Sequence, residues 1–182
     1  MAEKLFNILA PRAGSKTTKV MLYDDIGAFG VSANDFAAAL SGVTTSQIDL
    51  HINSYGGDIF DGLACYQALK DHPAEVTVHI DGLAASIASV IALAGKRVIV
   101  ARSGFMMIHN GSARANGDSA EIRKQADVLD KLCGAIAQVY ADRTGKALDE
   151  IRAAMTAETW FDADEAKAWG LADEVAGEGD KK

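Results

Sequence analysis

Ser86 has the residue type and position for nucleophilic chemistry, because it lies where a buried apolar segment begins. From Ile87 to Ala94 almost every residue is small and apolar, a composition typical of a helix buried on every side. A serine hydroxyl in that position ordinarily donates a hydrogen bond to a nearby backbone carbonyl. It can also attack a substrate, because the unpaired N–H groups and the dipole at a helix start favour developing negative charge. Both roles stay open from this segment alone.

A serine nucleophile needs a base, and His109 is the histidine best placed to provide one. It follows the apolar stretch 105–108 and precedes the loop-forming residues Asn-Gly-Ser. A side chain at a strand end beside a loop is well placed to face a cleft. His51 and His79 lie within alternating patterns and His72 ends a helical pattern, so we expect structural positions for these three.

The paired glycines Gly56 and Gly57, in "SYGGD", form a third piece. Glycine pairs allow positive φ and a close backbone approach to a ligand, so their N–H groups can line an anion site. An ordinary tight turn into a helix is the alternative. No G-K-[ST] follows, which argues against a phosphate loop.

The elements that would hold these pieces alternate between strands and helices, which predicts an α/β fold with a mostly parallel sheet. Ser32 with Asp35 forms a capping-box pattern that opens one helix, and Gly170 ends the last one. Strands are expected at 19–25, 47–53, 75–80, 97–101 and 105–109, with a last short one near the end. Helices are expected at 32–40, 58–72, from Ser86 onward, 118–145 and 147–155.

Composition narrows the class of protein. The net charge of -7 over 182 residues argues against a nucleic-acid-binding surface. No apolar run reaches the about 18 residues of a membrane span, and the first residues do not form a secretory signal. Cys65 and Cys133 are isolated in helical patterns, so we expect core thiols in a reducing cytoplasm and neither a disulfide nor a metal pair.

Four segments together resemble the Clp protease proteolytic subunit family, and they occur in the family's order over about residues 45–175. They are "INSYGGDIFDGLACY", "GLAASIAS", "FMMIHN" and "DADEAKAWGLADEV". The resemblance implies a crotonase-like α/β spiral of ββα units with a helical handle appended to it. It also implies a serine endopeptidase that uses neither cofactor nor metal.

The resemblance assigns roles to individual residues. Ser86 falls at the nucleophile and His109 at its general base, while the backbone N–H groups of Gly57 and Ile87 fall at the oxyanion hole. Glu158, in "ETW", falls where the family usually has the third triad member, an aspartate. Asp162, four residues later, is a second candidate for that role.

The resemblance also sets the expected domain organisation. Residues 1–18 are expected to be a flexible segment, 19–176 a single peptidase domain with the handle at about 118–155, and 177–182 a disordered tail. One helical stripe of the handle, with Ile122 and Leu129 in its first half, is expected at an interface of a homo-oligomeric ring or double ring. Its members are Ile122, Ala126, Leu129, Cys133, Ile136 and Tyr140.

Four departures from the housekeeping members resemble the phage and prophage branch, the Clp-like head maturation proteases. Tyr55 replaces a proline, "SIAS" replaces S-M-G or S-M-A, Glu158 replaces aspartate, and the long N-terminal pore segment is not found. The expected partner is therefore a polypeptide, such as a capsid or scaffold protein, cleaved in the cytoplasm without an obligatory ATPase.

Other functions remain as alternatives. A housekeeping Clp core working with an AAA+ unfoldase shares the chemistry. A crotonase-fold acyl-CoA enzyme or an inactive structural homologue needs no Ser–His pair. A Ser–Lys dyad with Lys96 is disfavoured, because about 15 Å of helix would separate Lys96 from Ser86.

Overall fold

The structure is a computed structural model that describes residues 6–9 and 15–178. Within these ranges eight strands form one sheet and six helices accompany it. The strands are β1 (Phe6–Leu9), β2 (Thr17–Leu22), β3 (Gln47–Ser54), β4 (Glu75–Ala85), β5 (Arg97–Val100), β6 (Phe105–Ile108), β7 (Thr159–Phe161) and β8 (Glu174–Val175). The helices are α1 (Ala33–Ser41), α2 (Ile59–Asp71), α3 (Ile87–Ala92), α4 (Ser119–Thr144), α5 (Leu148–Thr156) and α6 (Ala163–Trp169).

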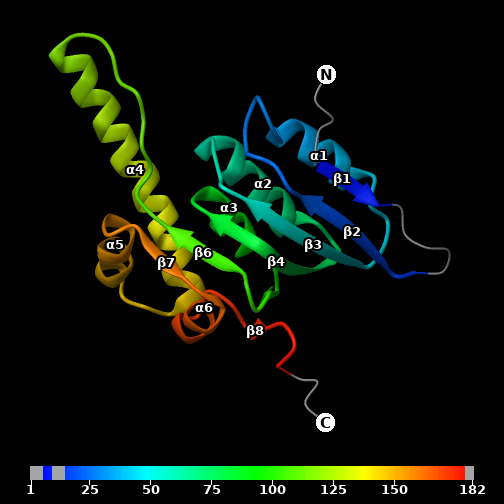
Figure 1. Cartoon of the computed structure of the whole chain (residues 1–182). Coiled ribbons are helices and arrows are strands. Elements are labelled where there is room, and N and C mark those ends of the chain that lie inside the picture. Colours follow the sequence, from blue (N-terminus) through cyan, green and yellow to red (C-terminus); the bar gives the residue numbers. More distant parts are fainter. Residues whose placement is uncertain (1–5, 10–14, 179–182) are drawn as a thin grey trace.

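The sheet is mostly parallel, as the alternation of strands and helices predicts. The order β1-β2-β3-β4-β5-β8 is parallel from β2 to β8, and only β1 runs antiparallel to its neighbour. β6 pairs in parallel with β4, and β7 pairs antiparallel with β6. Figure 1 shows α1 and α2 against one face of the sheet. The α/β fold class is confirmed.

Strand alternation decides which side chains reach the core. Along β3, Ile48, Leu50 and Ile52 are fully buried, whereas Asp49 and His51 on the other face are only half-buried. Burying one aliphatic side chain stabilises a fold by about 1.5–3 kcal/mol, so this face fixes the register of the strand. α3 is buried at every residue, which confirms the helix inferred from its composition.

β4 is longer than the sequence suggests. We expected this strand to end at Ile80, but it continues to Ala85, immediately before Ser86. The reason is a change of partner: residues 77–80 of β4 pair with β5, and residues 83–85 pair with β6. The hydrogen bonds of this second pairing stabilise an extended backbone in "DGLAA". The helix therefore begins only after Ser86, and α3 has six residues.

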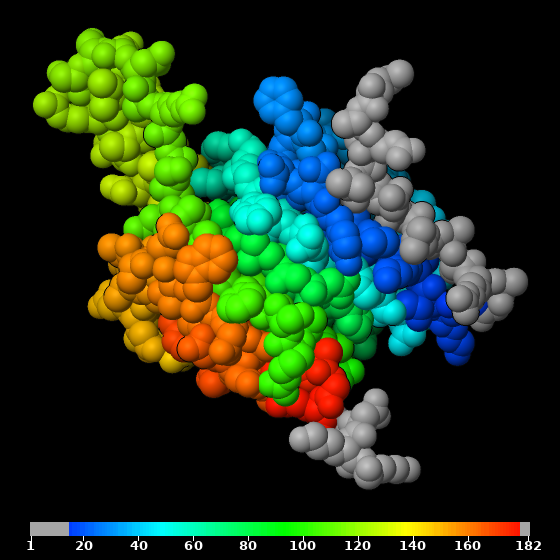
Figure 2. All heavy atoms as spheres, viewed as in Figure 1, coloured from blue at the N-terminus to red at the C-terminus, as the bar shows by residue number. Residues whose placement is uncertain are grey.

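α4 is held to the body by its C-terminal half only. Ile136, Ala137 and Tyr140 are buried, whereas the first half of the helix is exposed and stands clear of the body (Figures 1 and 2). A capping box at Asp118 and a left-handed C-cap at Gly145 define its ends. The predicted stripe is therefore a core contact in one half and an open surface in the other.

The N-terminal segment expected to be flexible contains a strand. Residues 6–9 form β1 on the edge of β2, which itself begins at Thr17 rather than Lys19. An edge strand presents unpaired backbone groups, and β1 satisfies those of β2. The predictions for residues 1–5, 10–14 and 179–182, which include most of the expected tail, lie outside the described residues.

The two cysteines differ in their surroundings. Cys65 is fully buried, and burial together with the nearby Asp61 carboxylate raises the pKa of its thiol to about 12. Cys133 is half-buried and packs against the edge of the core, where α4 begins to leave the body. Both thiols are free. None of the helices in the described part of the chain combines the length and apolar character that crossing a bilayer requires.

Candidate active site

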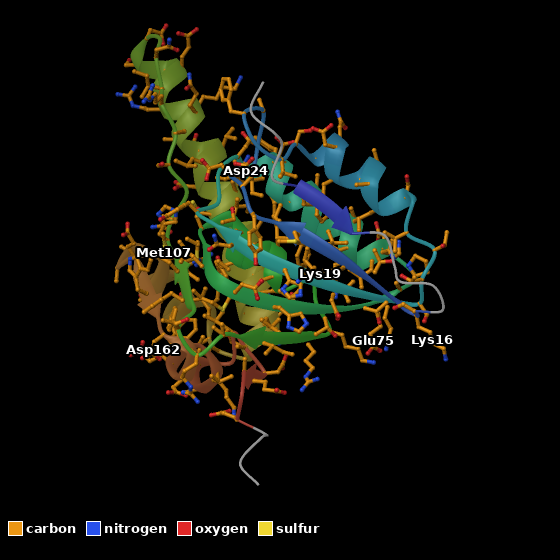
Figure 3. All side chains as sticks on the ribbon, turned by 45° about the vertical axis from the view of Figure 1, so that its right-hand side comes forward. Lys16, Lys19, Asp24, Glu75, Met107 and Asp162 are labelled. Carbon is orange, nitrogen blue, oxygen red and sulfur yellow. The ribbon has the colours of Figure 1, made fainter. Side chains whose placement is uncertain are left out.

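Three loops gather at one end of the sheet because β2, β3 and β4 run parallel. Lys16 and Glu75 lie at the end where β2 and β4 begin, and Asp24, just after β2, lies at the opposite end (Figure 3). The loop 24–31 follows β2, the loop 55–58 follows β3, and Ser86 follows β4. Open parallel sheets bind their ligands at this carboxyl end.

Ser86 is held in a strained conformation that presents its hydroxyl. Its φ of 54° and ψ of -130° are unfavourable for a side chain with a Cβ, and its N–H donates to Met107 O at 2.9 Å. The hydroxyl makes no capping bond to α3. Instead, Ser86 Oγ lies 2.8 Å from His109 Nε2. The Ser86 hydroxyl therefore contacts the histidine and does not bond to the backbone of α3.

Gly56 brings the glycine loop against this serine. A Cβ at Gly56 would lie 2.8 Å from Ser86 Cβ and 2.7 Å from Ala85 O, so no side chain fits there. The φ of 97° at Gly56 also favours glycine. Close approach and backbone conformation thus both require this residue type.

Gly57 and Ile87 are the predicted oxyanion donors. Ile87 directly follows the serine, and Gly57 directly follows Gly56, which approaches the serine closely. Among the described residues, no hydrogen bond engages the backbone N–H of either one. Both neighbours of Gly57 are hydrogen-bonded to Ile26. The Ile26 N–H donates to Gly56 O at 2.7 Å, and the Asp58 N–H donates to Ile26 O at 2.9 Å. The loop is therefore fixed while the Gly57 donor stays available.

Glu158 lies next to His109 because β7 pairs with β6. Ile108 is opposite Thr159 in this antiparallel pair, so the residues that flank them, His109 and Glu158, meet. Glu158 Oε2 lies 3.9 Å from His109 Nδ1, which is an ion-pair distance rather than a hydrogen bond. The Glu158 side chain is 58% exposed, and Trp160 Nε1 donates to its Oε1 at 3.4 Å.

Asp162, the second candidate for the acid, has another role in this structure. It is the N-cap of α6, where its Oδ1 accepts from Glu165 N–H at 2.8 Å. Lys96, the base of the alternative dyad, pairs with Glu75 at the opposite end of the sheet. Of the predicted residues, the geometry brings together Ser86, His109 and Glu158.

The other two strand histidines form a polar cluster on the open face of the sheet. His51 Nδ1 lies 2.7 Å from Asp81 Oδ2, which also accepts from the Tyr23 hydroxyl, and the rings of His51 and His79 stack 4.6 Å apart. Sequence reasoning placed both histidines in the sheet but missed their contact. The signal is the repeated "HIN" and "HID", which puts them at one register of neighbouring parallel strands. No group of three or more His, Cys, Asp or Glu side chains in the described ranges is arranged to hold a metal.

One cleft is lined in part by the glycine loop, and a second cleft is lined in part by Asn110, the residue after His109. The larger, of about 520 Å³, lies between the loops 25–30 and 55–58. The smaller, of about 300 Å³, lies beside the residue after the histidine and is lined by Asn110, Met155 and residues of α4. Asn110 N–H donates to Met155 O at 3.1 Å, which anchors the loop that follows His109. Both volumes are large enough to receive side chains of a ligand.

Comparisons with known proteins identify the family of the chain. The family model described as Clp protease matches residues 15–179. The ATP-dependent Clp protease proteolytic subunit 3 of Rhodococcus jostii is 37% identical over 131 residues, which are 70% of this chain and 64% of that protein. The corresponding subunit 3 of Streptomyces coelicolor is 34% identical over 80% of this chain and 70% of its own length.

A solved structure shows the same fold. A point mutant of ClpP1 from Listeria monocytogenes superposes with a TM-score of 0.77, over 86% of this chain and 90% of that one, at 24% identity. The match to the Rhodococcus relative spans just under two thirds of that protein's length. From the family model and the identities over more than two thirds of the sequence, the chain belongs to the Clp protease family of serine-type peptidases.

Proposed function

We propose that this protein is a serine endopeptidase that cleaves polypeptides with Ser86 as nucleophile and His109 as general base. The observation that carries the proposal is the 2.8 Å contact between Ser86 Oγ and His109 Nε2. A nucleophile within hydrogen-bond reach of its base is the minimum arrangement for acyl transfer. The strained serine backbone, which an ordinary surface serine does not need, supports the same reading.

The chemistry follows from these positions. His109 Nε2 takes the Ser86 proton as Oγ attacks the scissile carbonyl, and then returns it to the leaving amine. The N–H groups of Gly57 and Ile87 donate to the oxyanion of the tetrahedral intermediate. Removing one such donor typically costs about 2.7–4 kcal/mol of transition-state stabilisation. Water then hydrolyses the acyl-enzyme by the same proton route.

We propose Glu158 as the acid that orients His109. Its carboxylate faces Nδ1 of the ring, and a charge on this side stabilises the imidazolium that forms during attack. At 3.9 Å and half exposed, the contact is weaker than a buried hydrogen bond. A modest rotation of the glutamate would close this distance when substrate binds, since catalytic contacts commonly tighten in the complex.

Labelling with a fluorophosphonate tests the proposal directly. We expect a single adduct, mapped by peptide sequencing to Ser86, and no adduct in Ser86→Ala. His109→Ala should also remove labelling while leaving the far-UV circular dichroism unchanged. An adduct on Ser89 would overturn the assignment of Ser86 as the nucleophile. No adduct at all in folded protein would favour the inactive homologue or the crotonase-type acyl-CoA enzyme instead.

The finer proposal is that the substrates are capsid or scaffold proteins of a phage or prophage head, cleaved without an obligatory ATPase. Its support is the set of departures that resembles the head maturation branch: Tyr55, Glu158 and the stretch after Ser86. We further propose that the protein acts as a homo-oligomeric ring or double ring in the cytoplasm, a compartment that suits two free thiols.

A housekeeping core that works with an AAA+ unfoldase is the second candidate. The observation that favours it is that the relatives named above are called ATP-dependent Clp protease proteolytic subunits. Incubation with casein, with and without ATP and a Clp-type unfoldase, separates the two. Cleavage that needs neither supports the finer proposal, and cleavage only with both supports the housekeeping role.

A further inference from the structure

The peptide unit that joins Ser86 to Ile87 has a predicted oxyanion donor at one end, the Ile87 N–H, and the Ser86 carbonyl at the other. Because a trans peptide is planar, its C=O and N–H point in opposite directions. Contacts that fix the direction of Ser86 O therefore also fix the direction of the Ile87 N–H. In the described part of the chain no hydrogen bond engages this donor, and it lies beside the glycine loop, since a Cβ at Gly56 would be 3.1 Å from Ile87 N.

Ser89, in the first turn of α3, donates two hydrogen bonds to Ser86 O. Its backbone N–H donates at 3.0 Å, and its hydroxyl donates at 2.6 Å. The first bond is available to any residue other than proline, whereas the second requires a hydroxyl. Ser89 is fully buried, and a hydrogen bond in the protein interior is electrostatically stronger than one in water. The hydroxyl therefore adds a directional restraint to the carbonyl.

The Ser89 hydroxyl is held in turn by α4. Its Oγ lies 2.7 Å from the hydroxyl of Tyr140, which is buried as well. A serine hydroxyl has one hydrogen, and Ser89 directs it at Ser86 O, so Tyr140 is the donor in this second contact. The donors then follow one another in a single direction, from Tyr140 to Ser89, from Ser89 to the Ser86 carbonyl, and onward through the Ile87 N–H of that peptide. Hydrogen bonds in such a series polarise one another, which strengthens the last donor.

The backbone of Ser86 needs restraints of this kind. Its φ of 54° and ψ of -130° are strained for a residue with a Cβ, and such a conformation persists only where the surrounding contacts over-determine it. The peptide before Ser86 is fixed because the Ser86 N–H donates to Met107 O of β6 at 2.9 Å. The peptide after it, which carries the Ile87 N–H, is fixed by Ser89. Loss of the Ser89 hydroxyl would release the side of the nucleophile that carries the oxyanion donor.

We infer that Ser89 is a positioning residue for the oxyanion hole: supported by Tyr140, its hydroxyl holds the Ser86–Ile87 peptide so that the Ile87 N–H points at the developing oxyanion. The inference rests on the proposed peptidase function and extends it to two residues whose printed contacts lie behind the nucleophile, away from its hydroxyl. Oxyanion donors act because they are oriented before the reaction and need no reorganisation as charge develops. The contribution of Ser89 is therefore to the transition state rather than to substrate binding.

Steady-state kinetics of Ser89→Ala test this role. The probes are a fluorogenic peptide with the sequence of a casein site that the protein cuts, and the peptide aldehyde of the same sequence. We expect kcat to fall about ten-fold with little change in KM, a loss below the about 10²–10³ of a deleted oxyanion donor, because the Ile87 N–H is misdirected rather than removed. The aldehyde forms an adduct with a serine that places an oxygen in the oxyanion hole, so its affinity should fall by the same factor as kcat.

Matched variants separate orientation from loss of stability. Val90→Ala removes buried methyl groups from the same helix outside the chain of hydroxyls, so it should lower stability and keep kcat. Ser89→Thr and Ser89→Val add the same bulk, but only threonine keeps the hydroxyl, so kcat should be higher in Ser89→Thr. Tyr140→Phe leaves the Ser89 bond to Ser86 O in place and should lower kcat less than Ser89→Ala. Titration with a fluorophosphonate normalises every rate to the number of competent active sites.

The outcomes are distinguishable. A fluorophosphonate adduct on Ser86 together with a wild-type kcat and aldehyde affinity in Ser89→Ala would overturn the positioning role and leave the peptidase standing. An equal loss of kcat in Val90→Ala, or a loss in Ser89→Ala that lies in KM alone, would also overturn it. Absent labelling in the folded wild-type protein would overturn the proposed function and the positioning role with it.

Discussion

Ser89 and Tyr140 form a buried hydrogen bond, 2.7 Å between hydroxyl oxygens, that joins α3 to α4. Ser89 Oγ also lies 2.6 Å from Ser86 O, to which its single hydrogen is donated. Tyr140 must then be the donor to Ser89, which gives a chain that runs from Tyr140 through Ser89 to the carbonyl of the candidate nucleophile. Complete burial raises the pKa of the Tyr140 hydroxyl above its ordinary value, so the group remains a neutral donor.

This direction of donation predicts that the two ends of the bond are unequal. Ser89→Ala leaves the fully buried Tyr140 hydroxyl without an acceptor and should cost about 1–3 kcal/mol in free energy of unfolding. Tyr140→Phe removes only the donor and should cost less. In the Tyr140→Phe protein there is no buried hydroxyl left to lose its acceptor. Ser89→Ala should therefore lower the free energy of unfolding less in Tyr140→Phe than in the wild-type protein. Urea denaturation of the four proteins measures the coupling, and equal costs with strict additivity would contradict the chain.

The acid beside His109 can be identified by two isosteric changes. Glu158→Gln should lower kcat at least about ten-fold, because an amide cannot stabilise the imidazolium. The loss should stay below the about 10⁴ of a buried aspartate, since this carboxylate is 58% exposed.

Asp162→Asn is the matched control for that change. Asparagine caps helices as well as aspartate does, so this variant should retain activity and stability. Peptide hydrolysis under single-turnover conditions compares the two variants. If Asp162→Asn were inactive and Glu158→Gln normal, the assignment of the acid would have to be reversed.

The sequence was a good guide wherever a local pattern decides the structure. Alternation and caps located most strands and helices, and the glycine loop, Ser86 and His109 were each singled out from their own surroundings before the family resemblance joined them. It was a poor guide where pairing between distant segments decides. The extension of β4 depends on β6, and no strand was expected at 159–161, where β7 pairs with β6 and so carries Glu158 to His109.

The exposure of α4 could not be predicted for a related reason. Its stripe has one uniform apolar character from Ile122 to Tyr140, yet only the second half meets a surface of its own subunit. Periodicity shows that a helix face will be covered, but it does not show by what.

A glycine comparison tests the close approach at the active site. Gly56→Ala places a Cβ 2.7 Å from Ala85 O and 2.8 Å from Ser86 Cβ, in a backbone with a φ of 97°. We expect a loss of about 1–3 kcal/mol in stability from the strain and a near-complete loss of fluorophosphonate labelling. Gly134→Ala is the control: a Cβ there meets nothing within 4 Å, and alanine in a helix should stabilise the protein by about 0.5–1 kcal/mol. Normal labelling of Gly56→Ala would show that the loop tolerates a side chain.

The histidine cluster on the open sheet face predicts a pH dependence of stability. Burial lowers the pKa of His79 below its ordinary 6.5, and the neighbouring His51 adds to this effect, while Asp49 and Asp81 oppose it. A depressed histidine pKa means that the unfolded chain binds the proton first. This part of the stability is therefore complete above pH 6.5 and is lost as the pH falls through 6.5 towards the lower folded value.

Replacing His79 should remove that dependence. Urea denaturation between pH 5 and pH 8 should give a shallower decline of the unfolding free energy on acidification for His79→Gln than for the wild-type protein. His72→Gln is a suitable control, because His72 caps α2 outside the cluster. A wild-type slope that persists in His79→Gln would assign the dependence to other groups.

The exposed half of α4 should be an interface between copies of this chain. Ile122 and Val128 are 41% and 46% exposed, an unfavourable arrangement for apolar side chains of one helix unless a partner covers them. Neither side chain is part of the subunit core, so Ile122→Asp should leave the thermal unfolding of the subunit intact while placing a charge in a desolvated contact. Light scattering at micromolar concentration should then show a large particle for the wild-type protein and smaller ones for Ile122→Asp. Lys131→Gln changes the net charge by the same amount on the same helix and should keep the wild-type mass. A wild-type monomer, or an Ile122→Asp particle of unchanged mass, would mean that this half of the helix remains in solvent.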